Sequence, residues 1–344
     1  MEIVLITSFL ITLLILALPK SVTVNISDTI GIQKFHKKPT PRIGGIPIFI
    51  AFLFGVLLSP ETKHLFITLT IASLPVFIGG LWEDFTNKIG PTLRMIFTII
   101  SVVIAYIWMD IGIYQLGFKL PDYLLMNYSI IAAIFTVLVV SGVVHGMNII
   151  DGYNGLMPGY NIIVLLAISY IANIYDDTVV VNLSLILAIS ISGLLILNFP
   201  FGKIFIGDSG AYFCGFITTI IGLLLVSRHN ELSHWLLLTL FIYPLFEVAF
   251  SIYRKKFKRK MSPSMPDGLH MHMLIYKRLI KNKKNNLDST ICNSLTSPFL
   301  WCLSLISIIP GVIWHDNPNI LIMISLAFMA TYIIIYRRLV RFKW

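Results

Sequence analysis

Charge and cysteine are the two features that this sequence has little of. Only 12% of its 344 residues are charged, about half the fraction found in typical soluble domains, whereas 57% are hydrophobic. Its three cysteines, Cys214, Cys292 and Cys302, show neither the spacing of a zinc site nor a disulfide framework. A soluble enzyme, a disulfide-stabilised domain and a zinc-binding domain are therefore excluded, and we expect a polytopic membrane protein.

The sequence also lacks the phosphate-binding loop of nucleoside triphosphatases, because Gly-x-x-x-x-Gly-Lys-Ser/Thr occurs nowhere in it. Internal repeats and low-complexity tracts are absent as well. We therefore expect a single integral-membrane domain over residues 1–344.

Long apolar runs are what the sequence has instead. A bilayer is crossed by about 17–25 apolar residues in a helix, and about eleven segments approach that length. They predict an all-α polytopic membrane bundle of about 10–11 transmembrane helices. The segments are 3–18, 46–59, 65–81, 93–109, 128–147, 159–174, 180–198, 211–227, 235–253, 298–314 and 319–336.

Positive charge is confined to one set of alternate loops. Of the 26 lysines and arginines, all but Lys63, Lys119 and Arg228 fall in these loops or near the C-terminus. The positive-inside rule then predicts that these loops are cytoplasmic, with a periplasmic N-terminus and a cytoplasmic C-terminus. The formal net charge of +10 thus follows from topology and requires no nucleic-acid partner.

Five loops on the predicted cytoplasmic side are rich in polar and titratable residues. Loops held by rigid helices commonly carry binding and catalytic residues, so we expect the active site there. The loops are residues 20–45, 82–92, 148–158, 199–210 and 254–297.

Polar side chains recur at every third position where the fifth apolar run ends. On a helix this spacing makes one slanting polar ridge, and two following glycines favour a break. An ionisable group at a membrane helix end is costly unless it faces protein or a watery cavity, which favours a functional role; the alternative is a helix cap followed by a turn. The ridge is His145, Asn148, Asp151 and Asn154, and the glycines are Gly152 and Gly155.

The neighbouring carboxylates Glu83 and Asp84 lie at the mouth of another apolar run. Adjacent carboxylates repel each other and are tolerated beside a cation, for which a hard divalent ion with oxygen ligands is the natural candidate. The alternative is a solvated acidic turn balanced by Lys88 and Arg94.

Asp208 lies between Gly207 and Ser209 where a further helix is expected to start. Taken alone it is a common type of helix N-cap. Together with the doublet and Asp151, however, it makes three acidic motifs on one side of the membrane. This coincidence favours a single site that handles a polyanion.

The loop around residues 36–47 combines prolines, glycines and positive charge, including Lys38 and Arg42. Such a loop can hold an anion at a helix N-terminus. The alternative is a stiff basic loop that only obeys membrane topology.

His270 and His272 lie two positions apart, so they share no helix face. They can converge only on an extended or partly unwound backbone, where they would suit phosphate oxygens; the alternative is a pair of surface histidines on an interfacial helix. Glu247, which follows Pro244 in an apolar run, is expected to pair with a base of one of the loops on this side and to hold a kinked helix, a structural role; the alternative is catalysis.

The ordered motifs resemble those of bacterial polyprenyl-phosphate N-acetylhexosamine-1-phosphate transferases, glycosyltransferase family 4. That family includes the enzymes that initiate O-antigen and common antigen, and phospho-N-acetylmuramoyl-pentapeptide transferase. This sequence departs from the usual pattern at Glu83, His145, Asn154 and Met273. The motifs are Pro39-Thr-Pro-Arg-Ile-Gly-Gly, Glu83-Asp84, Asn148-x-x-Asp151-Gly-x-x-Gly-Leu, Gly207-Asp-Ser-Gly and His270-x-His272.

The resemblance implies transfer of a hexosamine 1-phosphate from a UDP-N-acetylhexosamine to undecaprenyl phosphate, with release of UMP. It implies Mg²⁺, with Mn²⁺ as a substitute, and a multi-pass protein of the bacterial inner membrane whose active site faces the cytoplasm. The histidine loop resembles the O-antigen branch more than the peptidoglycan branch, and a homodimer is compatible with the family.

Site residues follow from the same resemblance, position by position, except Lys38 and Arg42, which are expected from the basic loop at residues 36–47. The predicted catalytic residues are Glu83, Asp84 and Asp151, and the predicted metal ligands are Asp208 and Asp84. The predicted substrate-binding residues are Lys38, Arg42, Asn148, Asn154, His270 and His272.

The chemistry of such a reaction accounts for this inventory. A lipid phosphate that attacks a diphosphate brings like charges together, at a cost of about 4 kcal/mol at 4 Å and an effective dielectric constant near 20. Direct attack and a covalent phospho-aspartate both fit the residues. A transporter or flippase of an anionic lipid is the alternative function, but it predicts charges near the bilayer midplane and inverted repeats. An isoprenoid transferase would require repeated Asp-rich motifs.

Overall fold

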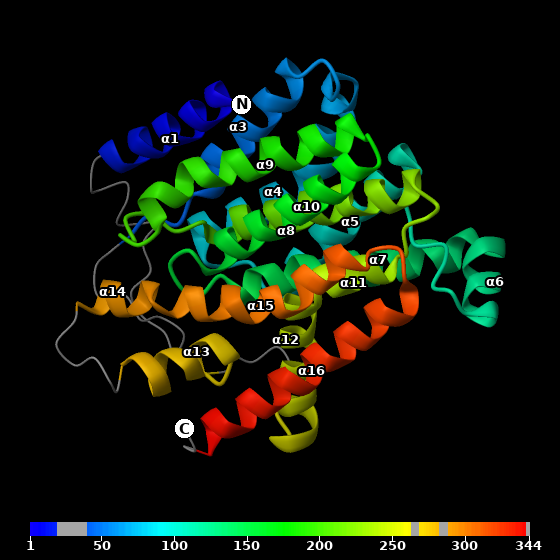
Figure 1. The fold of residues 1–344 in the computed structure, drawn as a ribbon. Coiled ribbons are helices and arrows are strands. Elements are labelled where there is room, and N and C mark those ends of the chain that lie inside the picture. Colours follow the sequence, from blue (N-terminus) through cyan, green and yellow to red (C-terminus); the bar gives the residue numbers. More distant parts are fainter. Residues whose placement is uncertain (19–39, 263–267, 282–287, 342–344) are drawn as a thin grey trace.

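The computed structural model describes residues 1–18, 40–262, 268–281 and 288–341 (Figure 1). Within these ranges every regular element is a helix, which confirms the all-α membrane fold. Among the described residues, eight helical segments are long and apolar enough to cross a membrane. They contain α4 (Phe66–Thr86), α5 (Pro91–Met109), α7 (Ser129–Ile150), α8 (Leu156–Ile174), α9 (Thr178–Asn198), α10 (Gly207–Arg228), α15 (Thr296–Ile313) and α16 (Pro318–Val340).

Three expected spans differ from these eight. The helices α1 (Glu2–Ala17) and α3 (Gly45–Leu58) are apolar but shorter. The run at 235–253 is not one helix, because it divides into α11 (Trp235–Leu240) and α12 (Ile242–Tyr253).

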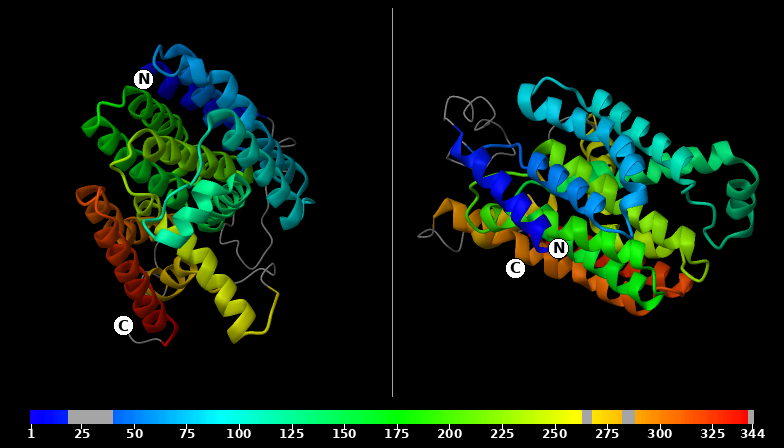
Figure 2. Two further views of the ribbon diagram at one scale, coloured as in Figure 1. Left: turned by 90° about the vertical axis from the view of Figure 1, so that its right-hand side faces the viewer. Right: turned by 90° about the horizontal axis from the view of Figure 1, so that it is seen from above.

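The break between α11 and α12 has a local cause. Pro244 has no N–H to donate to the carbonyl of Leu240 four residues earlier, so that carbonyl needs another partner. The hydroxyl of Tyr160, on α8, donates to it at 2.7 Å. Figures 1 and 2 show α12 running away from the long helices of the bundle.

Helix α10 lies at the centre of the bundle. Every residue from Gly207 to Val226 is buried, and the helix packs against α3, α4, α7, α8 and α9. Glycines allow the closest approaches: a Cβ on Gly45 would overlap the backbone of Gly210, and one on Gly80 would lie 2.5 Å from Ser209 Cα. The start of α10 is therefore pressed between α3 and α4.

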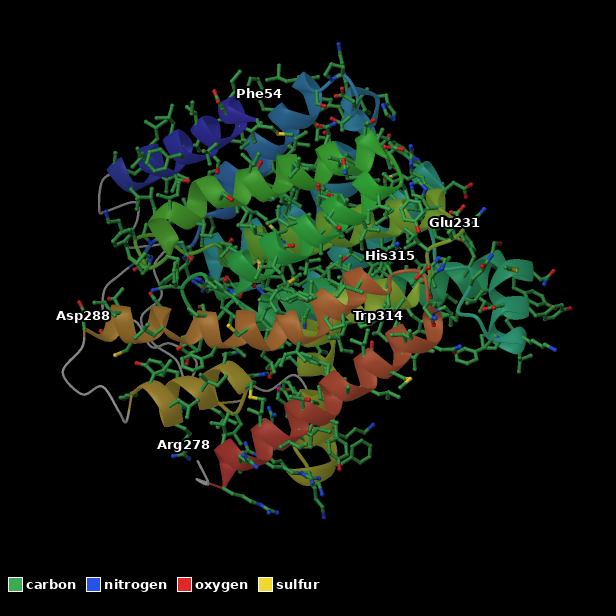
Figure 3. The ribbon with its side chains drawn as sticks, in the orientation of Figure 1. Phe54, Glu231, Arg278, Asp288, Trp314 and His315 are labelled. Carbon is green, nitrogen blue, oxygen red and sulfur yellow. The ribbon has the colours of Figure 1, made fainter. Side chains whose placement is uncertain are left out.

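Short elements lie at the two ends of the bundle. Figure 1 shows α6 (Lys119–Asn127) projecting from one end, and α13 (Met271–Ile275) and α14 (Ser289–Ser294) at the other. Figure 3 places Glu231 at the end where α10 finishes, and Asp288 and Arg278 toward the end where it begins. The remaining short helices are η1 (Lys63–Leu65), η2 (Arg254–Lys258) and η3 (Tyr276–Ile280).

Large apolar side chains cover the outside of the long helices. Ile107, Leu138 and Met323 are each about two-thirds exposed, at 66%, 66% and 68%. A water-soluble protein rarely exposes so continuous an apolar surface. The outer surface is therefore suited to lipid.

Candidate active site

A cavity of about 480 Å³ opens where α4 and α7 end and α10 begins. It brings together seven of the site residues predicted from separate loops: Arg42, Glu83, Asn148, Asp151, Asp208, His270 and His272. The other lining residues are Asn87, Arg94, Ile149, Gly152, Tyr153, Asn198, Phe205, Gly207 and Met273. Lys38 lies outside the described residues.

Asp208 occupies the first turn of α10, where the helix dipole favours negative charge. Its Oδ1 accepts a hydrogen bond from Arg42 Nη2 at 3.2 Å, and its Oδ2 accepts one from Arg94 Nη1. The sequence had assigned Arg94 only to charge balance. Its place in the first turn of an apolar helix was a usable signal, because a cation there needs a partner.

The Glu83–Asp84 doublet is divided between two tasks. Glu83 faces the cavity, and its Oε2 accepts a hydrogen bond from Ile89 N at 2.8 Å. Asp84 is buried, and its two oxygens accept hydrogen bonds from Asp208 N at 2.7 Å, Ser209 N at 2.9 Å and Ser209 Oγ at 2.6 Å. The sequence predicts that Asp84 shares a metal ion with Asp208. In the structure the carboxylate of Asp84 instead caps the N-terminus of α10.

The polar ridge is only partly present. Asn148 and Asp151 line the cavity, and the half-buried His145 has its ring edge-on to that of Tyr212, with centroids 5.2 Å apart. Helix α7 ends at Ile150, so the three-residue helical spacing does not continue to Asn154.

Asn154 is turned away from the cavity. Its Nδ2 donates to Ser294 Oγ at 3.0 Å, its backbone N donates to Asn293 Oδ1 at 2.8 Å, and its carbonyl accepts from Ser297 Oγ at 2.6 Å. In this geometry Asn154 joins the loop to α14 and α15, and the structure gives it no contact with the cavity that would support the predicted substrate role.

The Asp151 carboxylate accepts no hydrogen bond within the described part of the chain. Burial raises its pKa to about 7, against the lowering effect of Arg42, while Asp208 raises it further. A carboxylate without a partner at the wall of a cavity is available to a ligand.

The rings of His270 and His272 lie side by side, on the extended backbone that their two-residue spacing needs for this. His270 has extended backbone (φ −66°, ψ 152°) just before α13, so its ring and that of His272 stack, 5.4 Å apart and 4° from parallel. Glu247 pairs with His270 Nδ1 at 2.8 Å. This confirms the expected pairing of Glu247 with a loop base, which the structure identifies as His270.

His272 is fully buried, and neither of its ring nitrogens has a partner among the described residues. Burial, reinforced by His270, lowers its pKa to about 3, so the ring is neutral near pH 7. Because buried polar atoms are nearly always paired in native structures, these nitrogens indicate a ligand that enters the cavity.

The sequence around this cavity is similar to that of known proteins. The sequence model described as Glycosyl transferase family 4 matches residues 66–226, from α4 to α10. A probable undecaprenyl-phosphate N-acetylglucosaminyl 1-phosphate transferase of Bacillus subtilis is 30% identical over 273 residues, covering 78% of this chain and 75% of the relative. The chain belongs to glycosyl transferase family 4.

Other family 4 relatives are more distant. Undecaprenyl-phosphate alpha-N-acetylglucosaminyl 1-phosphate transferase of Salmonella typhi is 27% identical over 289 residues, covering 79% of this chain and 75% of its own. The Thermotoga maritima protein of the same name is 25% identical over 252 residues, covering 73% of each chain.

The match to the family 4 model covers only part of the cavity wall. Glu83, Asp151 and Asp208 lie inside the matched range of 66–226, whereas Arg42 and the two histidines lie outside it. The cavity therefore joins the matched range to two loops that flank it in the sequence.

The donor set of this family 4 site suits Mg²⁺ only together with a phosphate. Among the described residues there is no group of three His, Cys, Asp or Glu side chains placed to hold a metal. Mg²⁺ in phosphate-handling sites is commonly held by one or two carboxylates, with phosphate and water completing the shell, and Asp151 and Asp208 supply that number. Arg42 and Arg94 both bind the carboxylate of Asp208. A phosphate must therefore compete with Asp208 for the two guanidiniums.

Proposed function

We propose that this protein transfers N-acetylglucosamine 1-phosphate from UDP-N-acetylglucosamine to undecaprenyl phosphate and releases UMP. The supporting observation is one cavity, at the end of a membrane bundle, that combines Asp208, its two arginines and the unpaired ring of His272. The names of the family relatives specify the same sugar and lipid.

In this reaction an oxygen of the lipid phosphate attacks the phosphorus that carries the sugar, and the bond to UMP breaks. Both reactants are anions, so the site must cancel their repulsion. Arg42 and Arg94 provide two guanidiniums that hold phosphate oxygens in bidentate fashion. Asp208 and Asp151 would hold Mg²⁺, which when bound would supply positive charge to neutralise the diphosphate.

Glu83 is the carboxylate assigned to the lipid phosphate. It faces the cavity and is held by the N–H of Ile89, so it can orient the attacking oxygen or accept its proton. The second pKa of a phosphate monoester is near 6, so little base strength is needed. Asn148 and the neutral ring of His272 contribute uncharged hydrogen-bonding groups for the nucleotide sugar.

The same proposal includes the membrane in which the protein acts and the side on which its cavity opens. The distribution of lysine and arginine supports a cytoplasmic cavity in the bacterial inner membrane. The lipid-linked product would begin a cell-envelope polysaccharide of the O-antigen kind. Direct attack requires no protein nucleophile, and Asp84, saturated by three hydrogen bonds, is poorly placed to become one.

The test is UMP release by the purified protein in liposomes that contain undecaprenyl phosphate and MgCl₂. UDP-N-acetylglucosamine, UDP-N-acetylgalactosamine and UDP-glucose are supplied in parallel, and EDTA is the control for the metal. We expect turnover with UDP-N-acetylglucosamine that stops with EDTA. Turnover with another sugar only, or movement of the lipid between leaflets without UMP release, would overturn the proposal.

A further inference from the structure

Glu247 is a completely buried carboxylate in α12, and three groups converge on it. Its Oε1 lies 2.8 Å from His270 Nδ1 and accepts a bond from Met271 N at 3.3 Å. Its Oε2 accepts a hydrogen bond from the hydroxyl of Tyr332, on α16, at 2.7 Å. A buried carboxylate is retained only when its charge and lone pairs are satisfied, and here all the partners belong to one loop and one helix.

This arrangement determines which edge of the His270 ring faces the cavity. An ionised carboxylate only accepts hydrogen bonds, so Nδ1 must carry the hydrogen in the contact with Glu247. The other nitrogen, Nε2, has no partner among the described residues, and the ring lines the cavity. Nε2 is therefore the atom that a ligand meets.

Tyr332 is itself held in place. The rings of Phe246 and Phe250, both on α12, lie edge-on to it with centroids 5.0 and 5.6 Å away. Because the helix is interrupted at Phe241, α12 runs away from the bundle and places Glu247 beside the loop that carries His270. The last described helix thus contributes to a site whose motifs lie far from it in the sequence.

We propose that Glu247 and Tyr332 are positioning residues that hold His270 in the orientation and the Nδ1–H form in which Nε2 addresses the phosphates. The inference rests on the proposed function for the identity of the ligand. When the diphosphate is bound, a proton on Nε2 lets His270 donate to a phosphate oxygen, and Glu247 balances the charge of the ring. A carboxylate behind a histidine plays the same orienting part in metal sites and in hydrolases.

The experiment compares Glu247→Gln, Tyr332→Phe and Tyr243→Phe with the wild type in liposomes. Tyr243 is the matched control, because it is a buried tyrosine of α12 whose hydroxyl has no partner among the described residues. We expect Glu247→Gln to lower kcat by about 10–100-fold, as loss of an orienting partner does. The KM for UDP-N-acetylglucosamine should change far less. Tyr332→Phe should lower kcat by a smaller factor, and Tyr243→Phe should match the wild type.

Nitrogen-15 spectra of histidine-labelled protein, without substrate, give a readout that does not depend on turnover. His270→Asn identifies the His270 signals by their loss. In the wild type and in Tyr243→Phe, Nδ1 should be protonated, whereas Glu247→Gln should show a mixture of the two ring tautomers. Unchanged His270 signals in both Glu247→Gln and Tyr332→Phe would overturn the inference.

The proposed function and the positioning role of Glu247 can be rejected separately. If the wild type releases no UMP from any UDP-sugar, the proposed function is wrong, and the spectra still decide whether Glu247 positions the ring. If Glu247→Gln does not fold, Tyr332→Phe provides the decision through kcat and the spectrum. A Tyr332→Phe protein indistinguishable from Tyr243→Phe by both measures would then reject the positioning role.

Discussion

The two ends of α10 carry similar ion pairs with different surroundings. At its start, Asp208 binds the guanidiniums of Arg42 and Arg94. At its end, Asp177 accepts hydrogen bonds from Arg228 Nε at 2.7 Å and His229 Nε2 at 3.0 Å. Both clusters place a buried aspartate beside two basic side chains.

The clusters differ in what they leave unsatisfied. Asp177 also receives the N–H of Val180, as the N-cap of α9, so its oxygens are fully used within the protein. The cluster at Asp208 opens on a cavity in which Asp151 has no partner among the described residues and His272 has two unpaired nitrogens. A buried ion pair is therefore weak evidence for function; the indication of a ligand comes from the unpaired polar atoms beside it.

The largest expected effect tests this comparison directly. Asp208→Asn should lower the rate of UMP release on the order of 10³-fold, because several kcal/mol of cation-mediated charge stabilisation are lost. Asp177→Asn should leave the rate within about threefold, since its bonds only join helix ends, and should lower the melting temperature. UMP release and thermal unfolding in detergent measure the two quantities.

As controls, the Asp208→Asn protein should insert into the membrane and should elute as a single folded peak in size-exclusion chromatography. Comparable losses of rate in the two variants would show that both clusters act on activity through folding. The distinction between the two ends of α10 would then be lost.

A second comparison lies within the doublet. Glu83→Gln should lower kcat by about 10²-fold with little change in melting temperature, because Glu83 faces the cavity. Asp84→Asn should lower the free energy of unfolding by about 2 kcal/mol, because an amide cannot accept all three hydrogen bonds that now cap α10. Steady-state kinetics give kcat for the two variants, and thermal unfolding gives their stability.

If Asp84→Asn were inactive while melting at the wild-type temperature, Asp84 would act in the chemistry, as the sequence had suggested, and capping would be secondary.

The sequence supported the fold better than the details of the site. Apolar length and composition are local properties, so the long helices were predictable. Pro244 is a local signal for a kink as well, but the sequence cannot show that Tyr160, from another helix, satisfies the carbonyl that this proline frees. The partners of Arg94 and Asp84 could not be read from the sequence either, because both side chains bond to the start of α10, more than a hundred residues away.

The rate of UMP release should depend on pH through the Asp151 carboxylate at the wall of the cavity. Burial raises the pKa of Asp151 to about 7, so its ionised form is lost as pH falls below 7. If the ionised form is required, the rate should fall about tenfold per pH unit on the acid side. Asp151→Asn should be slower and should lack this limb.

Stability should move in the opposite direction. The raised pKa means that the folded state binds the proton more tightly than the unfolded chain, whose aspartate titrates near 3.9. This group therefore favours the folded state below about pH 4, and that contribution is lost as pH rises to 7. Melting temperatures of the wild type relative to Asp151→Asn across pH 4–8 give the sign, and a difference that rises with pH would contradict the assignment.

The smallest effect separates the two asparagines of the ridge. Asn148 lines the cavity, whereas the side chain of Asn154 bonds to Ser294. Asn154→Ala should cost about 1 kcal/mol of stability and leave the KM for UDP-N-acetylglucosamine within about twofold. Asn148→Ala should raise that KM about tenfold, as loss of a hydrogen bond to a charged ligand does. An equal rise in KM for both variants would mean that the loop turns Asn154 toward the substrate on binding. The glycine at position 155, in the left-handed region at φ 77°, would then be the pivot to test.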